Sequence, residues 1–184
     1  MKKKLLLSLF LFLIFFNNVF GEVFRLKDFR QILTHLQQAT NVYERSDSLN
    51  TYYFSRISSL PKTGSIDEIT PHSIQTTIGL SSFLCEKMII KDLNLAPEKR
   101  WAHQVIDFNL APSEGLLLNR RIELIKNYSQ LFWLRDPDAE ETKILDSFIQ
   151  DLMASYPDDS KSLLQILTAT CVSFAASFDS QLAI

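Results

Sequence analysis

Glycine is scarce in this sequence, with four residues in 184. A chain so poor in glycine offers little material for phosphate-binding loops or for tight β-hairpin turns. Its two cysteines are too few for a disulfide-rich scaffold, and no CxxC, CxxCH or HExxH motif occurs. Basic residues number 19 against 21 acidic ones, so charge gives no indication of nucleic-acid binding.

Motifs for metal, cofactor or nucleophilic chemistry are also missing. The three histidines, at 35, 72 and 103, are far apart in the sequence, and there is no GxSxG nucleophile motif. The acidic stretch over 136–141 does not fit a calcium loop, because Glu141 stands where the loop needs glycine. Acidic residues in the first turn of a helix explain this stretch better. We therefore expect no metal, no cofactor and no enzymatic activity.

Residues 1–21 have the features of a cleaved signal peptide. Three lysines at positions 2–4 precede a twelve-residue apolar run from Leu5 to Phe16, and Val19 and Gly21 fit the −3 and −1 positions of a cleavage site. An uncleaved membrane anchor is the alternative. Cleavage leaves 163 residues, with 16 basic and 21 acidic side chains and no second run long enough to span a membrane. The expected location is periplasmic or extracellular, and the acidic balance disfavours nucleic acid as a partner.

The composition of residues 22–184 predicts an all-α fold. This part contains 22 Leu and 15 Ile but only four Val and three Gly, and no long run alternates apolar and polar residues. Apolar residues at helical spacing predict helices near 25–40, 49–60, 71–91, 97–108 and 114–134, then one from the Asp136–Pro137 pair to Pro157 and one from Asp158–Ser160 to Phe178. We expect a single domain, a compact bundle of six or seven helices with orthogonal or mixed crossing angles. The last helix is apolar around much of its circumference, which predicts a central position.

One set of polar residues has the spacing of a candidate site. On a helix over 97–108, Arg100, His103, Gln104 and Asp107 would share one face, where Asp107 could orient His103 as a general base. The alternative is a solvated polar face opposite the apolar side of that helix. A solvated face predicts that alanine at His103 or at Asp107 changes the free energy of unfolding by no more than about 0.5 kcal/mol.

Three consecutive aromatic residues form a second candidate. Tyr52, Tyr53 and Phe54 would point to three sides of a helix, so they cannot all enter the core. An exposed aromatic side chain there could contact a partner protein. Packing of all three against a neighbouring helix or loop is the alternative.

The two cysteines are predicted to form a disulfide. Export would place Cys85 and Cys171 in an oxidising compartment, and each lies on the apolar side of its predicted helix. Both should therefore point into the same core, close enough to pair. Two separate buried thiols are the alternative.

These features together favour an exported, non-catalytic helical protein. We expect it to bind a macromolecular partner, such as another envelope or secreted protein, or to serve as an envelope component. One alternative is a small-ligand-binding or hydrolytic domain that uses the His103 and Asp107 face. Another is an acidic inhibitor or immunity protein that blocks a basic partner.

Overall fold

The computed structural model describes residues 25–26, 29–43, 51, 71–177, 180 and 182–183. The fold is all-α. In these ranges the α-helices are α2 (Phe29–Thr40), α4 (Pro71–Leu93), α5 (Pro112–Gly115), α6 (Leu118–Phe132), α7 (Ala139–Ser155) and α8 (Ser160–Ala175), with a 3₁₀ turn, η1 (Pro97–Lys99). Two short strands, β1 (Arg25–Leu26) and β2 (Leu182–Ala183), pair antiparallel. The predicted helix over 49–60, with Tyr52, Tyr53 and Phe54, falls almost entirely outside the described residues.

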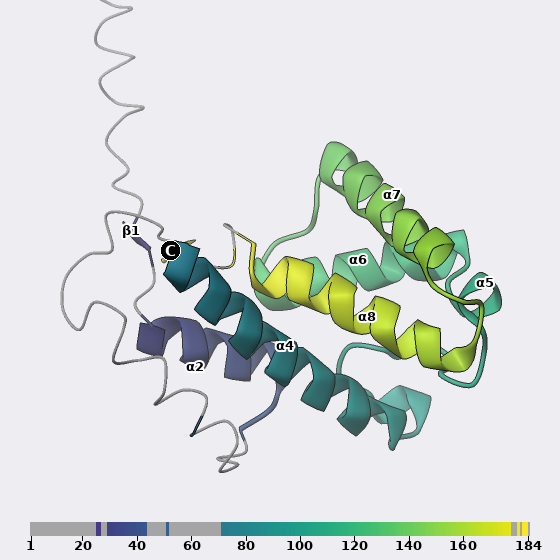
Figure 1. Ribbon diagram of the computed structural model, residues 1–184, viewed down its shortest axis with the longest axis horizontal. Coiled ribbons are helices and arrows are strands. Elements are labelled where there is room, and N and C mark those ends of the chain that lie inside the picture. The colour runs from purple at the N-terminus through teal and green to yellow at the C-terminus, as the bar shows by residue number, and fades with distance from the viewer. Residues whose placement is uncertain are drawn as a thin grey trace, which may run out of the picture.

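Helix α8 lies at the centre of the bundle, as its apolar circumference predicts. It contacts α4 along one side and α5, α6 and α7 on others. Figure 1 shows α4 and α8 side by side and running in opposite directions, with α2 beyond α4 and with α6 and α7 on the far side of α8. The core between these helices contains the fully buried side chains of Leu84, Leu124, Tyr128, Leu167 and Phe174.

The first helix begins later than its apolar spacing predicts. Leu26 belongs to β1, where it pairs with Leu182, and α2 begins at Phe29. Residues near the two ends of the described chain are therefore joined by backbone hydrogen bonds. Local periodicity could not predict this pairing, because it depends on residues more than 150 positions apart.

The predicted helix over 114–134 is two helices. Helix α5 ends at Gly115, and α6 begins at Leu118. Between them, Leu116 has a non-helical backbone and a fully buried side chain, and its carbonyl accepts a hydrogen bond of 2.8 Å from Arg121. Gly115 packs close to α8: a Cβ atom there would lie 3.3 Å from the Leu163 side chain. The break thus allows close packing against α8, while Arg121 satisfies the freed carbonyl.

Three caps differ from, or refine, those expected from the sequence. Helix α7 is capped by Asp138, not Asp136, in a capping box with Glu141. Arg135 donates two hydrogen bonds, of 2.7 and 2.6 Å, to Glu141, which lowers the pKa of that carboxyl to about 2. Ser113, which precedes the predicted helix start at residue 114, lies inside α5 and is not its N-cap; its hydroxyl donates to Asp158, 2.6 Å away. Asp159, within the predicted cap of the last helix, caps α8.

Candidate functional site

The predicted polar face over 97–108 does not exist. After the single 3₁₀ turn at Pro97–Lys99, the chain continues in turns and bends, so Arg100, His103, Gln104 and Asp107 share no helix face. Gln104 and Asp107 are exposed, and Asp107 accepts its hydrogen bonds from Asn109. His103 is fully buried and its partner is Asp92. Asp107 therefore orients no imidazole here.

Side chains hold this loop in place of helical hydrogen bonds. The Asp92 carboxylate accepts from the backbone N–H groups of Trp101, Ala102 and His103, at 2.8, 2.9 and 3.2 Å. The Arg100 guanidinium donates to the backbone carbonyls of Leu95, His103 and Ile106. Because Asp92 and Arg100 satisfy these backbone groups, residues 100–106 need no helix to do so. This is the physical reason why the helix is missing.

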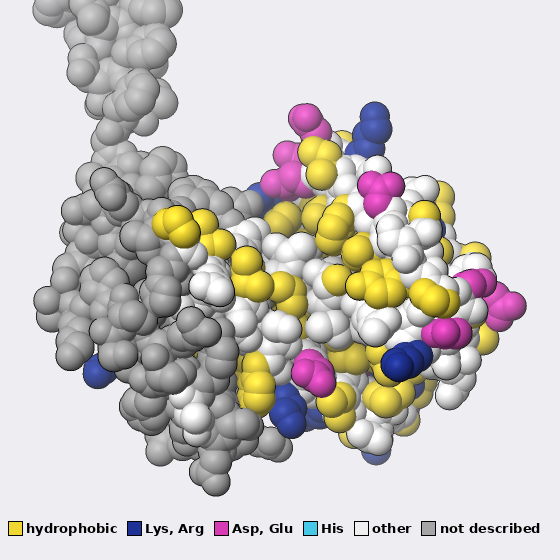
Figure 2. Space-filling view, viewed as in Figure 1, with side chains coloured by type: hydrophobic (Ala, Val, Ile, Leu, Met, Phe, Trp, Pro, Cys, Tyr) yellow, Lys and Arg dark blue, Asp and Glu magenta, His cyan; other side chains and the backbone are white. Residues whose placement is uncertain are grey.

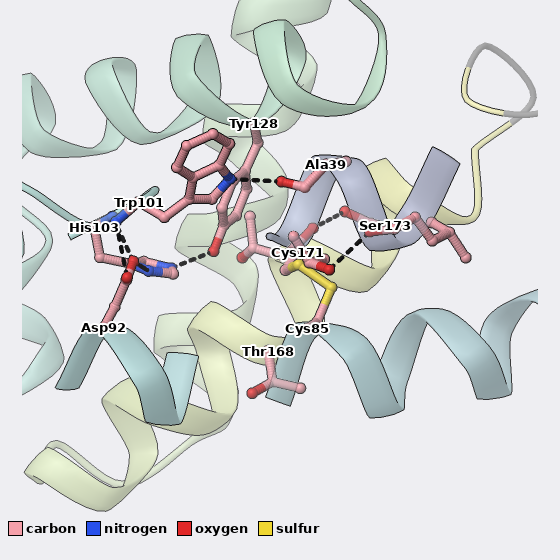
Figure 3. The surroundings of a disulfide bond; sticks show 12 residues. Ala39, Cys85, Asp92, Trp101, His103, Tyr128, Thr168, Cys171 and Ser173 are labelled. Carbon is pink, nitrogen blue, oxygen red and sulfur yellow. Dashed lines mark hydrogen bonds and ion pairs between the residues drawn. A yellow bond between two sulfur atoms is a disulfide. The ribbon is translucent and has the colours of Figure 1, made fainter. Parts of the chain in front are cut away.

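A buried chain of hydrogen bonds joins α4, this loop and α6. His103 Nδ1 lies 2.8 Å from Asp92 Oδ2, and His103 Nε2 lies 2.6 Å from the Tyr128 hydroxyl. Figure 3 shows the three side chains in a line, with Trp101 beside them donating its indole N–H to the carbonyl of Ala39 in α2. We call Asp92, His103 and Tyr128 the buried triad.

Burial and hydrogen bonding together set the protonation of the triad. Burial alone would raise the pKa of Asp92, but the hydrogen bonds from His103 and from the backbone amides hold it below its ordinary value. Burial lowers the pKa of His103, against the opposing effect of Asp92. Burial raises the pKa of Tyr128 well above its ordinary value. At neutral pH, Nδ1–H of a neutral His103 therefore donates to the Asp92 carboxylate, and the Tyr128 hydroxyl donates to Nε2.

The triad has the acid–imidazole–hydroxyl order of a catalytic charge relay, but it is closed to solvent. All three residues have 0% of their surface exposed, so no substrate reaches the Tyr128 hydroxyl in this structure. Each donor and acceptor named above also has a partner within the triad or the backbone. The arrangement suits a structural tie between three segments better than proton transfer to a bound molecule.

The triad should make stability depend on pH. His103 keeps its neutral form when folded but titrates near pH 6.5 when unfolded, so below that pH the unfolded chain binds the additional proton. We expect the free energy of unfolding to fall as pH decreases below about 6.5. The fall should be steeper than in His103→Gln, which keeps the other two histidines. Urea unfolding at several pH values checks this, and equal slopes in the two proteins would contradict it.

The disulfide joins α4 and α8, the two helices in most extensive contact in the described part of the chain. Cys85 of α4 and Cys171 of α8 form the bond that the sequence predicts, with their Cα atoms 5.9 Å apart and both side chains fully buried (Figure 3). The bond closes a span of 86 positions. It therefore fixes the distance between α4 and α8 at these two positions, in the C-terminal half of each helix.

Between them, α4 and α8 form an apolar groove of about 780 Å³ at the surface of the protein. The α4 wall consists of Ile78, Ser82, Glu86, Ile89, Ile90 and Leu93. The α8 wall comprises Leu164, Gln165, Thr168, Ala169, Val172, Ser173 and Ala176. Figure 2, which views the face carrying α4 and α8, shows hydrophobic side chains gathered over both helices. We call this the α4–α8 groove.

Neither the groove nor Asp92 is among the residues that sequence reasoning selected. The sequence contains one local indication that Asp92 has a special role. A carboxylate in the last turn of a helix interacts unfavourably with the helix dipole, so it needs hydrogen-bond donors or a cation nearby. The groove had no such indication, because Leu164 has the spacing of a core residue although its side chain is only half-buried. Tyr52, Tyr53 and Phe54 lie outside the described residues.

The described ranges contain neither a metal-binding cluster nor a membrane-spanning helix. There, no three His, Cys, Asp or Glu side chains group closely enough to bind a metal ion. The helices in this part of the chain are too short or too polar to cross a membrane.

Comparison with known proteins gives no relative: no family model, curated protein or solved structure matches the chain. Function must therefore be inferred from the site itself.

Proposed function

We propose that this is an exported, non-catalytic binding protein whose binding surface is the α4–α8 groove. The observation that supports binding is the groove itself. Its volume, about 780 Å³, falls in the range of ligand sites, and its lining is mainly aliphatic with a few hydroxyl groups. The triad offers no reacting group at a solvent-accessible surface, so binding explains the accessible chemistry better than catalysis does.

The groove is also open along its length. Ile78, Ile90 and Leu93 keep 44%, 44% and 40% of their surface exposed, although they lie on one side of α4. Isolated exposed aliphatic side chains are ordinary, but a continuous set lining a concave surface is typical of an interaction site. A partner that covers this set would bury apolar area that the folded chain leaves in water.

Export is the second part of the proposal. It rests on the charged, apolar and small-residue segments of 1–21 together with the Cys85–Cys171 disulfide, which needs an oxidising compartment to persist. The partner would then be another envelope or secreted protein.

N-terminal sequencing of the protein from the periplasm or medium should begin at Glu22, within a few residues. A chain that retains Met1 in the membrane fraction would contradict export.

The groove is tested by filling it. The neutral dye Nile red should bind the mature, disulfide-bonded protein with increased fluorescence, because it enters a partly dry apolar site. Ala169→Trp, in the α8 wall, should remove most of this signal by occupying the groove. Ala154→Trp, at an exposed position on α7, is the matched control and should leave the signal unchanged.

Far-UV dichroism should show both variants folded. If Ala169→Trp does not fold, Ala176→Trp at the end of the groove makes the same test. Equal dye binding by the wild type and a folded groove variant would contradict the groove as an accessible binding surface.

A further inference from the structure

The groove has the length and periodicity of a docking site for one helix. Its α4 wall runs from Ile78 to Leu93 and its α8 wall from Leu164 to Ala176, each about 20 Å at 1.5 Å per residue. Along both walls the lining residues recur about every fourth position, so each helix presents a continuous stripe to the groove. A third helix of about four turns would complete the packing of these two stripes.

Several of the side chains that line the groove are small. Ser82 on α4 faces the groove together with Ala169 and Ser173 on α8. Small side chains let the backbone of an incoming helix approach closely, while the aliphatic residues of the lining offer apolar contacts. Because the Cys85–Cys171 bond holds the two walls together, little conformational freedom would be lost on binding.

The charge of the groove is of one sign. Glu86 is the only ionisable residue in the lining given above, and it is exposed. No lysine or arginine there could attract an anionic lipid headgroup. A carboxylate beside an apolar groove instead favours a partner that brings a cation to that position.

We propose that the α4–α8 groove binds an amphipathic helix of a partner protein, with a lysine or arginine of that helix placed against Glu86. This inference rests on the proposed function, and it adds the shape and charge of the partner. A half-open, nearly straight groove between two helices suits a helix better than a small molecule, most of whose surface would have to be enclosed.

Three synthetic peptides test the charge selection. Each has sixteen residues, an alanine background, leucines at i, i+4, i+7 and i+11, and a central flanking position occupied by Lys, Gln or Glu. Fluorescence anisotropy with the mature, disulfide-bonded protein should show the Lys peptide binding about fivefold or more tightly than the Glu peptide. In Glu86→Lys the order should reverse, and in Glu86→Gln the preference should disappear. Because Glu86 is exposed, neither substitution threatens the fold.

The outcomes separate this inference from the proposed function. Equal binding of all three peptides, lost in Ala169→Trp, would overturn the charge selection and leave the groove as a binding surface. Absence of binding by every peptide, with Nile red still bound, would overturn the helical partner. Co-sedimentation of the wild-type protein, but not of Ala169→Trp, with phosphatidylglycerol vesicles would assign the groove to a membrane surface and overturn the inference. If Ala169→Trp blocks neither peptide nor dye, both proposals fail.

Discussion

Replacing Asp92 with alanine should lower the free energy of unfolding by about 3–5 kcal/mol, the range seen when one partner of a buried ion pair or network is removed. The truncation leaves three backbone N–H groups and the Nδ1–H of His103 without their acceptor. Each buried, unsatisfied donor costs about 1–3 kcal/mol, less whatever water can recover by entering the space. Urea unfolding monitored by far-UV dichroism measures the change.

Asp107→Ala is the matched control for this experiment. Asp107 lies in the same loop and is exposed, and its carboxylate accepts hydrogen bonds from Asn109, so its replacement should change stability by no more than about 0.5 kcal/mol. A loss below about 1 kcal/mol in Asp92→Ala would mean that the triad does not hold the loop.

Removing the disulfide should have an effect of similar size. We expect the double variant Cys85→Ala, Cys171→Ala to lose about 2–5 kcal/mol, because the unfolded chain regains the freedom that a closed span of 86 positions denies it. Part of the loss would come from two small cavities where the sulfur atoms pack. Paired urea titrations of the oxidised wild type and the variant give the difference.

Thiol titration of the wild type decides whether this comparison is valid. Denatured but unreduced protein should show no reactive thiol. Two thiols per chain would contradict the bond and with it the fixed spacing of the groove walls. If the wild type shows no reactive thiol and the double variant is equally stable, the disulfide exists but does not stabilise the fold.

Much of the helical framework follows from sequence periodicity. The α4 segment was predicted from a proline at its start and apolar residues at helical spacing, and α8 from its Asp158–Ser160 cap and its apolar circumference. The disulfide followed because Cys85 and Cys171 lie on apolar stripes of these two helices. Each of these inferences needed only residues close together in the sequence, or the assumption that all helices bury their apolar sides in one core.

The sequence-based predictions are wrong where long-range contacts replace local hydrogen bonds. The 97–108 segment has the spacing of a helix, but Asp92 on α4 accepts the amide hydrogen bonds that would otherwise be helical. A solvated polar face predicts that His103 tolerates alanine, whereas its burial against Asp92 and Tyr128 predicts a large loss of stability. No pattern within 97–108 contains the position of Asp92, so the error could not be avoided locally.

The groove was missed for a related reason. The apolar circumference of the last helix predicts a central position, but periodicity cannot tell an apolar stripe that another helix covers from one that is left open. That distinction depends on how many helices surround α8. In the described part of the chain, α4, α5, α6 and α7 surround it and leave this stripe half-covered.

A nitrogen–proton NMR titration of the mature, disulfide-bonded protein with the Lys peptide tests binding in the groove most directly, because it locates the contact residue by residue. We predict that the shifted amides cluster at Ser82 and Glu86 on α4 and at Ala169 and Val172 on α8. Shifts centred instead on the exposed apolar residues Leu118 and Ile122 of α6, or saturating shifts with no focus on α4 and α8, would contradict the groove as the binding surface.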